Sequence, residues 1–288
     1  MIEVIAPGFY TSIQDQGRKG NRHLGIPVSG AMDQKAFKLA HFLLGNPSDT
    51  SIIECTLIGP ILLFRESCSI VLTGAKMEVW LNDTPIKNNI PINIKPGDTL
   101  KLRRVLKGLR TYIKINQVLI LPNILGSTSF YKPLTKDSVL KKGTYLFWMK
   151  NGIINKQANS RIRFDESYIT DSNIYVKKGP EFNVLKEDQK KKLFKESFVV
   201  SNQNRMGYRL ATPFIIKTPS MLSAAVQPGT VQITPSGILL IAGFDGQVTG
   251  GYPRILQLSD EGMHVLFQKK EADDVFFKLC DTHLQMEL

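Results

Sequence analysis

The stretch SIVLTGAKMEVWLND, residues 69–83, decides the fold class of this 288-residue chain. It contains two short runs of β-branched and large apolar residues, Ser69–Leu72 and Met77–Leu81, and it ends in the turn signal Asn82-Asp83. Short apolar runs bounded by Gly, Asn and Asp are typical of β-strands joined by tight turns. The stretch therefore predicts strands rather than helix in this part of the chain.

Runs of the same kind recur along the chain, with Pro96-Gly97-Asp98 and Pro235-Ser236-Gly237 as turn signals between them. They are Ile61–Phe64, Thr99–Leu102, Thr111–Ile115, Tyr145–Trp148, Ile174–Val176, Phe214–Ile216, Val231–Ile233, Ile238–Ala242 and Val275–Leu279. Because helical windows are few, the pattern favours a β-sandwich or β-barrel over a parallel α/β sheet. We therefore expect a mainly β protein with a few short helices.

Two windows have the apolar spacing of amphipathic helices. The first is Asp33–Leu44, for which Asp33 is the predicted N-cap and Gly45 the predicted stop. The second is Glu187–Phe198, which places Leu193, Phe194 and Phe198 on one side. The apolar stripe of the first helix consists of Ala36, Phe37, Ala40, Leu43 and Leu44.

The two predicted helices lie at comparable places, one early in each half of the chain. This arrangement indicates two similarly built halves, which we place at residues 1–150 and 151–288. The polar stretch Gly152–Arg163 between them is the predicted linker.

The composition narrows the class of protein. The formal net charge is +12 and the sequence pI is about 9.5, but the lysine-rich stretch Lys186–Lys195 also contains acidic residues, as on a solvated helix face. We therefore do not expect a nucleic-acid partner. There is no apolar run of membrane-spanning length, no signal-peptide pattern at the N-terminus, and an odd number of cysteines, 3. We expect a cytoplasmic protein that does not enter membranes.

Several standard catalytic devices are missing from the sequence. It has no GxxxxGK[ST] phosphate loop, no GxGxxG after a strand and no GxSxG elbow. Cys55 lies beside Glu54 in an apolar stretch, where its thiol would be a poor nucleophile. We predict no metal site, because no metal-ligand spacing links the four histidines, His23, His41, His264 and His283. Carboxylates and positioned amides must therefore carry any chemistry.

The N-terminal stretch 7–18 is dense in glycine and polar groups. Within five positions, Gln14, Asp15 and Arg18 supply an amide, a carboxylate and a guanidinium. These groups suit a binding site, but an internal Asp15–Arg18 pair that holds a loop explains them equally. Further on, the Ser29-Gly30-Ala31 turn before the first helix can present backbone N–H groups to an oxygen or an anion. Asp33 then contacts a ligand or acts only as the N-cap.

The second half contains two short stretches that are rich in polar residues. Arg205, Tyr208 and Arg209 flank Gly207 and suit a carboxylate or phosphate group, with structural ion pairing as the alternative. The glycine-rich stretch 244–253 must form a loop, and polar loop residues on a β scaffold often bind ligands. Its candidate residues are Asp245, Gln247, Thr249, Gly250, Gly251 and Tyr252.

These polar stretches, in this order, resemble the motifs of the carboxyltransferase-like family. That family includes the C subunit of 5-oxoprolinase, an antagonist of a sporulation-kinase inhibitor, and the carboxyltransferase region of urea carboxylase. The matching stretches are Pro7-Gly8, residues 14–18, residues 25–33, residues 44–47, Gly59-Pro60, residues 73–75, residues 205–210, residues 228–232 and residues 245–253.

The resemblance implies two cyclophilin-like β-barrel domains and a partner protein. That partner is a homologue of the oxoprolinase's B subunit, which resembles the kinase inhibitor, and an A-subunit homologue is also possible. The resemblance further implies ATP-dependent opening of a lactam or similar small amide, 5-oxoproline to glutamate in the oxoprolinase. Such a site needs a cation for the substrate carboxylate, donors for the developing oxyanion and a carboxylate that orients water.

The resemblance suggests residues for each of these roles. The cation is Arg18, or Arg205 with Arg209, and the oxyanion donors are the Ser29–Ala31 turn and Gln232. The catalytic carboxylates are predicted to be Asp15, Asp33 and Asp245, converging on one cleft. The remaining predicted substrate contacts are Gln14, Tyr208, Gln247, Thr249, Gly250, Gly251 and Tyr252.

Residues 115–142 depart from the family pattern, because glycine-rich segments of the family are replaced here by Ile115–Val118 and Tyr131–Lys142. This departure argues against biotin as a cofactor, and of the two alternatives to the hydrolase it favours the first. One is a catalytically idle protein that binds a B-subunit homologue and so regulates a kinase. The other is biotin-dependent carboxyl transfer.

Overall fold

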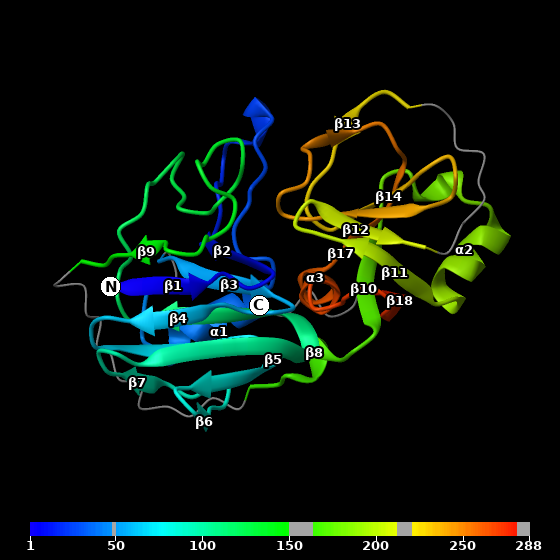
Figure 1. Cartoon of the computed structure of the whole chain (residues 1–288). Helices are drawn as coiled ribbons and strands as arrows, with labels where there is room; N and C mark the ends of the chain where they lie inside the picture. Colours follow the sequence, from blue (N-terminus) through cyan, green and yellow to red (C-terminus); the bar gives the residue numbers. More distant parts are fainter. Residues whose placement is uncertain (48–49, 150–163, 212–220, 281–288) are drawn as a thin grey trace. The chain divides into compact units, whose positions relative to one another are not determined.

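The computed structural model describes residues 1–47, 50–149, 164–211 and 221–280, and these form two compact units (Figure 1). The N-terminal unit comprises residues 1–20 and 28–169, and the C-terminal unit comprises residues 21–27 and 170–288. Both units are built mainly from β-strands, as the apolar runs predict. None of the described helices is long and apolar enough to cross a membrane.

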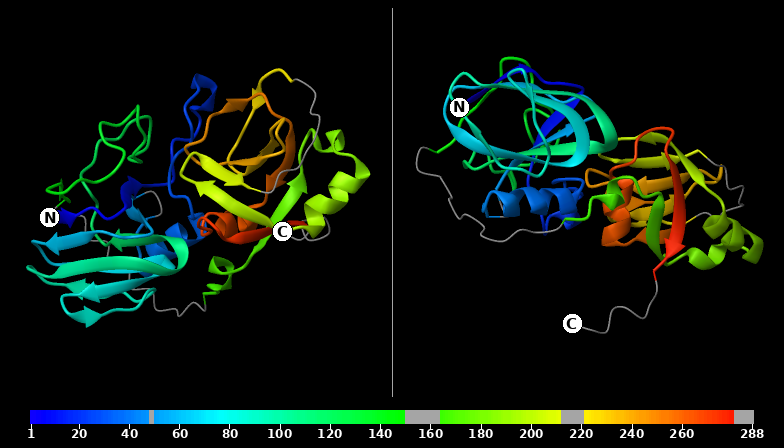
Figure 2. Two further views of the ribbon diagram at one scale, coloured as in Figure 1. Left: turned by 45° about the vertical axis from the view of Figure 1, so that its right-hand side comes forward. Right: turned by 90° about the horizontal axis from the view of Figure 1, so that it is seen from below.

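The N-terminal unit is a curved nine-stranded sheet, and the right-hand view of Figure 2 shows how it curls into a half-barrel. Its main path runs in the order β2-β3-β8-β4-β1-β9, and β5 pairs with β6, β7 and β8. The strands are β1 (Ile2–Ala6), β2 (Tyr10–Gln14), β3 (Ile52–Thr56), β4 (Ile61–Phe64), β5 (Cys68–Leu81), β6 (Thr84–Pro85), β7 (Ile92–Ile94), β8 (Thr99–Ile115) and β9 (Tyr145–Leu146).

The two runs that open the sequence analysis belong to one long strand, β5, and the runs at 99–102 and 111–115 likewise merge into β8. Gly74 explains why β5 continues between its two runs. Its φ is +84°, and a Cβ at this position would lie 2.6 Å from the carbonyl oxygen of Arg110. Glycine therefore allows a bulge here, where the register shifts, instead of a turn.

Helix α1 (Gln34–Leu43) packs its apolar stripe on one face of this sheet, which confirms the first predicted helix. Asp33 is its N-cap, and the carboxylate accepts hydrogen bonds from the backbone N–H groups of Lys35 and Ala36 at 3.1 and 3.0 Å. The hydroxyl of Tyr168 donates to the same carboxylate at 2.7 Å. The 3₁₀-helix that contains Tyr168 (Ser167–Ile169) is thereby joined to the N-terminal unit.

The C-terminal unit is a closed barrel of seven strands in the order β10-β17-β14-β15-β12-β11-β18 (Figure 1). Outside the barrel, β13 (Ala224–Ala225) pairs with β16 (Thr249–Gly250). The barrel strands are β10 (Asn173–Lys178), β11 (Phe198–Gln203), β12 (Gly207–Leu210), β14 (Thr230–Ile233), β15 (Leu239–Ala242), β17 (Arg254–Leu258) and β18 (Asp274–Leu279).

Two α-helices and two 3₁₀-helices complete this unit within the described ranges: α2 (Glu187–Lys195), α3 (Asp260–Leu266), Arg22–Leu24 and Phe182–Val184. The sequence predicts α2, but the helix ends at Lys195 and Phe198 begins strand β11 instead. Helix α3 has only 7 residues, too few for its apolar spacing to indicate a helix.

The boundary between the units falls at 169/170 rather than near 150. Side-chain contacts explain the difference. Besides the Tyr168–Asp33 bond, Lys76 forms an ion pair of 2.9 Å with Glu166, so residues 164–169 pack with the N-terminal unit. The predicted linker 152–163 and the predicted strand Phe214–Ile216 lie outside the described residues.

Replacing the N-cap should destabilise the N-terminal unit. Asp33→Ala removes the acceptor of three hydrogen bonds, and we expect a loss of about 2 kcal/mol in the free energy of unfolding. Asp33→Asn keeps an acceptor for the helix N–H groups and should lose less. Both tryptophans of the chain, Trp80 and Trp148, lie in this unit, so their fluorescence during urea unfolding measures the effect. An unchanged midpoint for Asp33→Ala would contradict the capping role.

Candidate functional site

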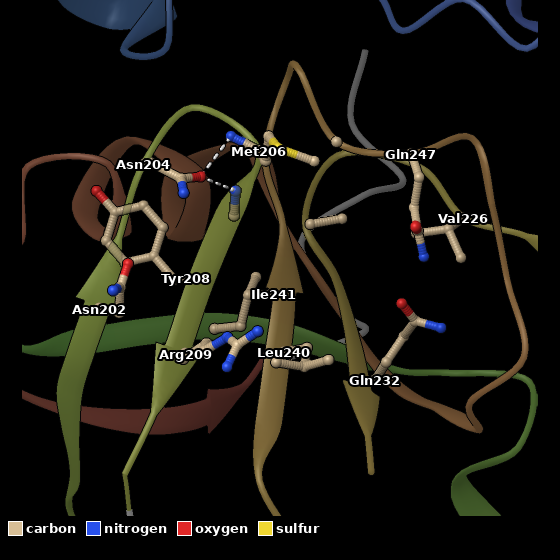
Figure 3. Close-up of a pocket in the computed structure, with 13 residues that line it drawn as sticks. Asn202, Asn204, Met206, Tyr208, Arg209, Val226, Gln232, Leu240, Ile241 and Gln247 are labelled. Atoms are coloured by element: carbon tan, nitrogen blue, oxygen red, sulfur yellow. Dashed lines mark hydrogen bonds between the residues drawn. The ribbon is translucent and has the colours of Figure 1, made fainter.

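The C-terminal barrel carries a pocket of about 250 Å³ on its outer face (Figure 3). Four neighbouring strands form its floor, and register places Asn202 beside Arg209, Arg209 beside Leu240, and Leu240 beside Gln232. Side chains alternate along a strand, so the neighbours Tyr208 and Ile241 point into the barrel core and are buried. A row of two amides, a guanidinium and one aliphatic side chain therefore crosses the barrel wall.

Two loops form the rim of this pocket. In the turn between β11 and β12, the side-chain oxygen of Asn204 accepts hydrogen bonds from the N–H groups of Met206 and Gly207 at 2.8 and 3.1 Å. The second loop follows β15, and Figure 3 shows the side chain of Gln247 pointing from it toward Gln232. The rim therefore adds further amides to the polar row.

A buried ion pair joins the two rim loops. The guanidinium of Arg205 contacts both carboxylate oxygens of Asp245, with Nε–Oδ2 at 2.7 Å and Nη2–Oδ1 at 3.2 Å. The backbone N–H of Asp245 also donates to the carbonyl oxygen of Arg205 at 3.0 Å. Because both side chains are buried and the contact is bidentate, the pair holds the loops in a fixed relation. This finding supports the structural alternative for Arg205, whereas Arg209 lines the pocket.

The glycine-rich loop 244–253 closes the pocket beside Gln232. The side-chain amide of Gln232 donates to the carbonyl oxygen of Tyr252 at 3.2 Å. A Cβ at Gly250 would lie 2.6 Å from the nitrogen of that amide, so a larger residue at this position would displace the side chain of Gln232. The backbone of Tyr252 therefore helps to position the side chain of Gln232, and the absence of a side chain at Gly250 leaves room for it.

The pocket has the chemistry of a site for a small polar molecule. Among the described residues that line it, Arg209 is the one charged side chain, and it suits a carboxylate. The side-chain amides both donate and accept hydrogen bonds, which suits the N–H and C=O groups of an amide ligand. Concave sites with few polar groups on a partly apolar floor are typical of small-molecule binding.

The N-terminal candidates surround a second buried carboxylate, that of Asp15. It accepts hydrogen bonds from the hydroxyls of Ser127 and Ser129 at 2.7 and 2.6 Å, from both the N–H and the hydroxyl of Thr128 at 2.6 and 3.0 Å, and from the N–H of Gly17 at 2.7 Å. These bonds fasten the 127–129 loop to the end of strand β2.

Arg18 contacts the same loop through its guanidinium. It donates to the carbonyl oxygens of Ile124 and Ser129 at 3.2 and 2.5 Å. Asp15 and Arg18 therefore each contact a loop that lies more than 100 residues further along the chain. Gln14 donates to the hydroxyl of Ser12 at 2.9 Å.

Burial and hydrogen bonding act on the pKa of Asp15 in opposite directions. Burial alone raises the pKa, but the hydrogen bonds from Ser129, Ser127, Thr128 and Gly17 outweigh it and leave the pKa below its ordinary value. The group is therefore an ionised acceptor near neutral pH rather than a proton donor.

The Ser29–Ala31 turn is held in an unusual conformation. Ser29 has φ +56° although it is not glycine, and it is followed by Gly30 at φ +88°. The N–H of Ala31 donates to the carbonyl oxygen of Asp15 at 2.9 Å, which leaves this N–H occupied. The hydroxyl of Ser29 is buried, and no hydrogen-bond partner for it is found among the described residues. Strained residues with an unsatisfied polar group often mark functional sites.

Further along this turn, a buried polar network fixes the start of α1. The N–H of Met32 donates to Glu54 at 2.8 Å, the N–H of Asp33 donates to the hydroxyl of Tyr112 at 2.7 Å, and that hydroxyl donates to Glu54 at 2.8 Å. Burial, followed by the charge of Glu54, raises the pKa of Tyr112 well above its ordinary value, so the phenol stays protonated and donates. The sequence analysis does not identify Glu54 or Tyr112 as part of a site.

The structure thus brings the predicted residues together in two groups. Arg209, Gln232 and Gln247 line the pocket of the C-terminal unit, and Tyr208 borders it although its buried ring points into the barrel core. Arg205, Asp245 and residues 249–252 lie around it. Gln14, Asp15, Arg18, residues 29–31 and Asp33 lie in the N-terminal unit. Because Asp15 and Asp33 belong to one unit and Asp245 to the other, their convergence on a single cleft stays a prediction.

Sequence reasoning missed the pocket residues Asn202, Met206 and Leu240. The alternation of β11 and β15 is the signal for Asn202 and Leu240, because it places them on the outer face with Arg209. Elsewhere, burial and the neighbouring charge of Glu54 raise the pKa of the Cys55 thiol, which confirms that it is a poor nucleophile. No group of three or more potential metal ligands occurs within the described ranges.

The fold and these loops define a class of protein. A family model described as carboxyltransferase domain, subdomain A and B, matches residues 24–279, so the chain belongs to the carboxyltransferase domain family. Within that family it is 30% identical to the C subunit of 5-oxoprolinase from Escherichia coli K12, over 97% of this chain and 91% of the relative.

Two further relatives extend the comparison. The urea amidolyase of Lachancea kluyveri is 32% identical over 74% of this chain, which corresponds to 13% of that protein. The crystal structure of the Kluyveromyces lactis urea amidolyase matches with a TM-score of 0.82 and 28% identity, over 96% of this chain and 18% of that chain. This chain therefore spans most of its oxoprolinase relative, whereas it corresponds to a small part of the amidolyases.

The lowered pKa of Asp15 predicts a pH-dependent contribution to stability. Asp15→Asn should lower the free energy of unfolding by about 3 kcal/mol, because the charged acceptor of several bonds is lost. A lowered folded-state pKa stabilises the native state above the unfolded value of about 4, and this stabilisation is lost as the pH falls through the folded value. The difference between wild type and variant should thus be complete above about pH 5 and shrink below about pH 4. Tryptophan fluorescence during urea unfolding measures it, and a constant difference would contradict the role.

The buried Arg205–Asp245 pair is expected to contribute to the free energy of unfolding. Arg205→Met leaves a buried carboxylate without its cation and should cost about 3–5 kcal/mol, whereas Arg205→Met with Asp245→Leu should recover much of that loss. The control is Arg104→Met, which breaks the exposed pair with Glu78 and should cost less than about 1 kcal/mol. Calorimetric unfolding compares the variants. Equal losses for Arg205→Met and Arg104→Met would show that the buried pair does not hold the loops.

Proposed function

We propose that this chain is one subunit of a two-component, ATP-dependent amide hydrolase of the 5-oxoprolinase type, which opens 5-oxoproline to glutamate in the cytoplasm. Its partner is a B-subunit homologue, and an A-subunit homologue is an additional candidate component to be tested with the pair. The C subunit of 5-oxoprolinase from E. coli, which this chain matches along nearly its whole length, supports the enzyme class. The amide-lined pocket with Arg209 supports the substrate class.

The proposed substrate matches the pocket group by group. 5-Oxoproline carries one carboxylate and one lactam, and the guanidinium of Arg209 binds the carboxylate. The side chains of Gln232, Gln247 and Asn202 supply donors and acceptors for the lactam N–H and C=O. The aliphatic side chain of Leu240 packs against the ring methylenes.

The chemistry requires activation of the lactam, because its carbonyl is a poor electrophile. Transfer of the γ-phosphoryl group of ATP to the lactam oxygen makes the ring carbon electrophilic. Water then attacks that carbon and the C–N bond breaks, which leaves an acyl phosphate that a second water hydrolyses to glutamate and phosphate. This chain has no phosphate-loop motif, so we assign nucleotide binding to the complex with the partner.

The residues of this chain orient the substrate and its surroundings. Side-chain amides that face the lactam oxygen stabilise the negative charge that develops there. Asp245 positions the rim of the pocket through Arg205, and Asp15 positions the Ser29–Ala31 turn through its carbonyl oxygen. Direct catalytic roles for Asp15, Asp33 and Asp245 stay predictions.

Two other functions give different outcomes in the same experiment. A catalytically idle regulator forms a stable complex with the B-subunit homologue and releases neither glutamate nor phosphate. Biotin-dependent carboxyl transfer is favoured by the similarity to urea amidolyases. It requires turnover that depends on a biotin carrier rather than on 5-oxoproline.

The decisive experiment mixes the purified chain with the A-subunit and B-subunit homologues of the same organism, ATP and 5-oxoproline, and measures glutamate and phosphate. Arg209→Gln should raise KM for 5-oxoproline at least about tenfold, because the charged partner of the carboxylate is lost. The control is Arg103→Gln, at an exposed arginine of the N-terminal unit, which should leave KM unchanged. Equal KM values for both variants would remove Arg209 from the substrate site.

A further inference from the structure

The N-terminal unit exposes a continuous apolar surface at the outer edge of its sheet. We call it the edge patch, and its residues are Val118, Ile120, Tyr145, Phe147 and Met149. The exposed fractions of the four largest are high: 56% for Ile120, 46% for Tyr145, 52% for Phe147 and 54% for Met149.

Backbone pairing puts these side chains on one face. The segment 118–120 lies antiparallel to 147–149, with the N–H of Ile120 donating to the carbonyl oxygen of Phe147 at 2.8 Å, and Leu119 opposite Trp148. Leu119 and Trp148 are buried in the core of the unit, so their chain neighbours point outward. The exposure of the edge patch is therefore imposed by the same alternation that fills the core.

Such a surface is unusual for a protein that works alone. Single exposed apolar residues are common, but contiguous patches of large ones mark interaction sites. Aromatic residues and methionine are enriched in protein interfaces, and the rings of Tyr145 and Phe147 lie 6.4 Å apart in this one. The edge patch has the composition of an interface centre.

The charges around the edge patch indicate what covers it. The segment 117–149 that carries it contains four lysines and one acidic residue, Asp137, which gives a local charge of 4 − 1 = +3. Lys141 and Lys142 lie in the turn before strand β9, and both are exposed. A partner surface that complements the edge patch therefore has an apolar centre surrounded by acidic residues.

The patch also borders groups of both signs. Glu3 pairs in register with Tyr145 and forms an ion pair of 2.6 Å with Arg65, while Lys141 forms one of 2.5 Å with Asp137. Acidic groups at the rim disfavour an anionic lipid surface, whereas protein interfaces accommodate mixed charges in a polar rim. In the K. lactis urea amidolyase the matched part is 18% of a longer chain, so this domain occurs beside other protein there.

From these observations we infer that the edge patch is the docking site of a protein partner with an apolar centre and an acidic rim. This inference rests on the proposed function, in which the partner is the B-subunit homologue. The basic, apolar segment 117–149 therefore binds that partner, while the pocket of the C-terminal unit faces the substrate.

The test measures the affinity of the chain for the purified B-subunit homologue of the same organism by calorimetry. Phe147→Ser with Met149→Ser should weaken binding at least about tenfold, since central apolar contacts dominate interface energies. The matched control is Ile90→Ser with Leu106→Ser in the same unit, where the exposed fractions are 52% and 54%. This control should bind like wild type. Lys142→Glu should slow association and flatten its salt dependence.

The outcomes separate this inference from the proposed function. If wild type binds and the Phe147/Met149 variant binds equally well, with thermal unfolding unchanged, the docking site is wrong and the proposed function stands. If wild type does not bind the B-subunit homologue at all, both are wrong. Two other results would overturn the inference. If wild type self-associates and the variant does not, the edge patch binds a second copy of the chain. If wild type binds anionic phosphatidylserine vesicles and the variant does not, it binds a membrane.

Discussion

The buried carboxylate of Asp15 is the constraint on which the arrangement of the N-terminal unit depends. It lies at the end of strand β2 and accepts hydrogen bonds from Gly17 and from the 127–129 loop. The carbonyl oxygen of the same residue accepts a hydrogen bond from the N–H of Ala31. A buried charge is tolerated only when its hydrogen-bonding capacity is filled, so three segments distant in sequence must meet there. The strained Ser29 persists because its neighbour Ala31 is fixed in this way.

The C-terminal unit uses a buried carboxylate in the same manner. Asp245 satisfies Arg205 and thereby fixes two loops above the strand row that carries Arg209. In both units the acidic group lies behind the polar surface rather than on it. The polar groups that line the pocket of the C-terminal unit are side-chain amides and the guanidinium of Arg209.

Periodicity and turn chemistry predict the β class, helix α1 with its cap, and the loops around the pocket, because these depend on neighbours in sequence. They do not predict that β5 continues through Gly74, since a bulge depends on the carbonyl oxygen of Arg110 across the sheet. The same limit applies to the acidic residues. The sequence does not show whether a carboxylate such as Asp15 or Asp245 has a structural role or binds a ligand. That depends on partners distant in sequence, such as Ser127 and Arg205.

The segment 115–142 departs from the family pattern, and it also supplies hydrogen-bond donors to the carboxylate of Asp15. Its Ser127 and Ser129 contribute hydroxyls that fill the hydrogen-bonding capacity of the buried carboxylate. A few residues away, the same chain exposes Ile120 beside Phe147. A segment anchored so firmly at one point can vary its outer surface without disturbing the pocket, which is lined entirely by residues of the other unit. The residues of the edge patch and those of the pocket can therefore change independently of one another.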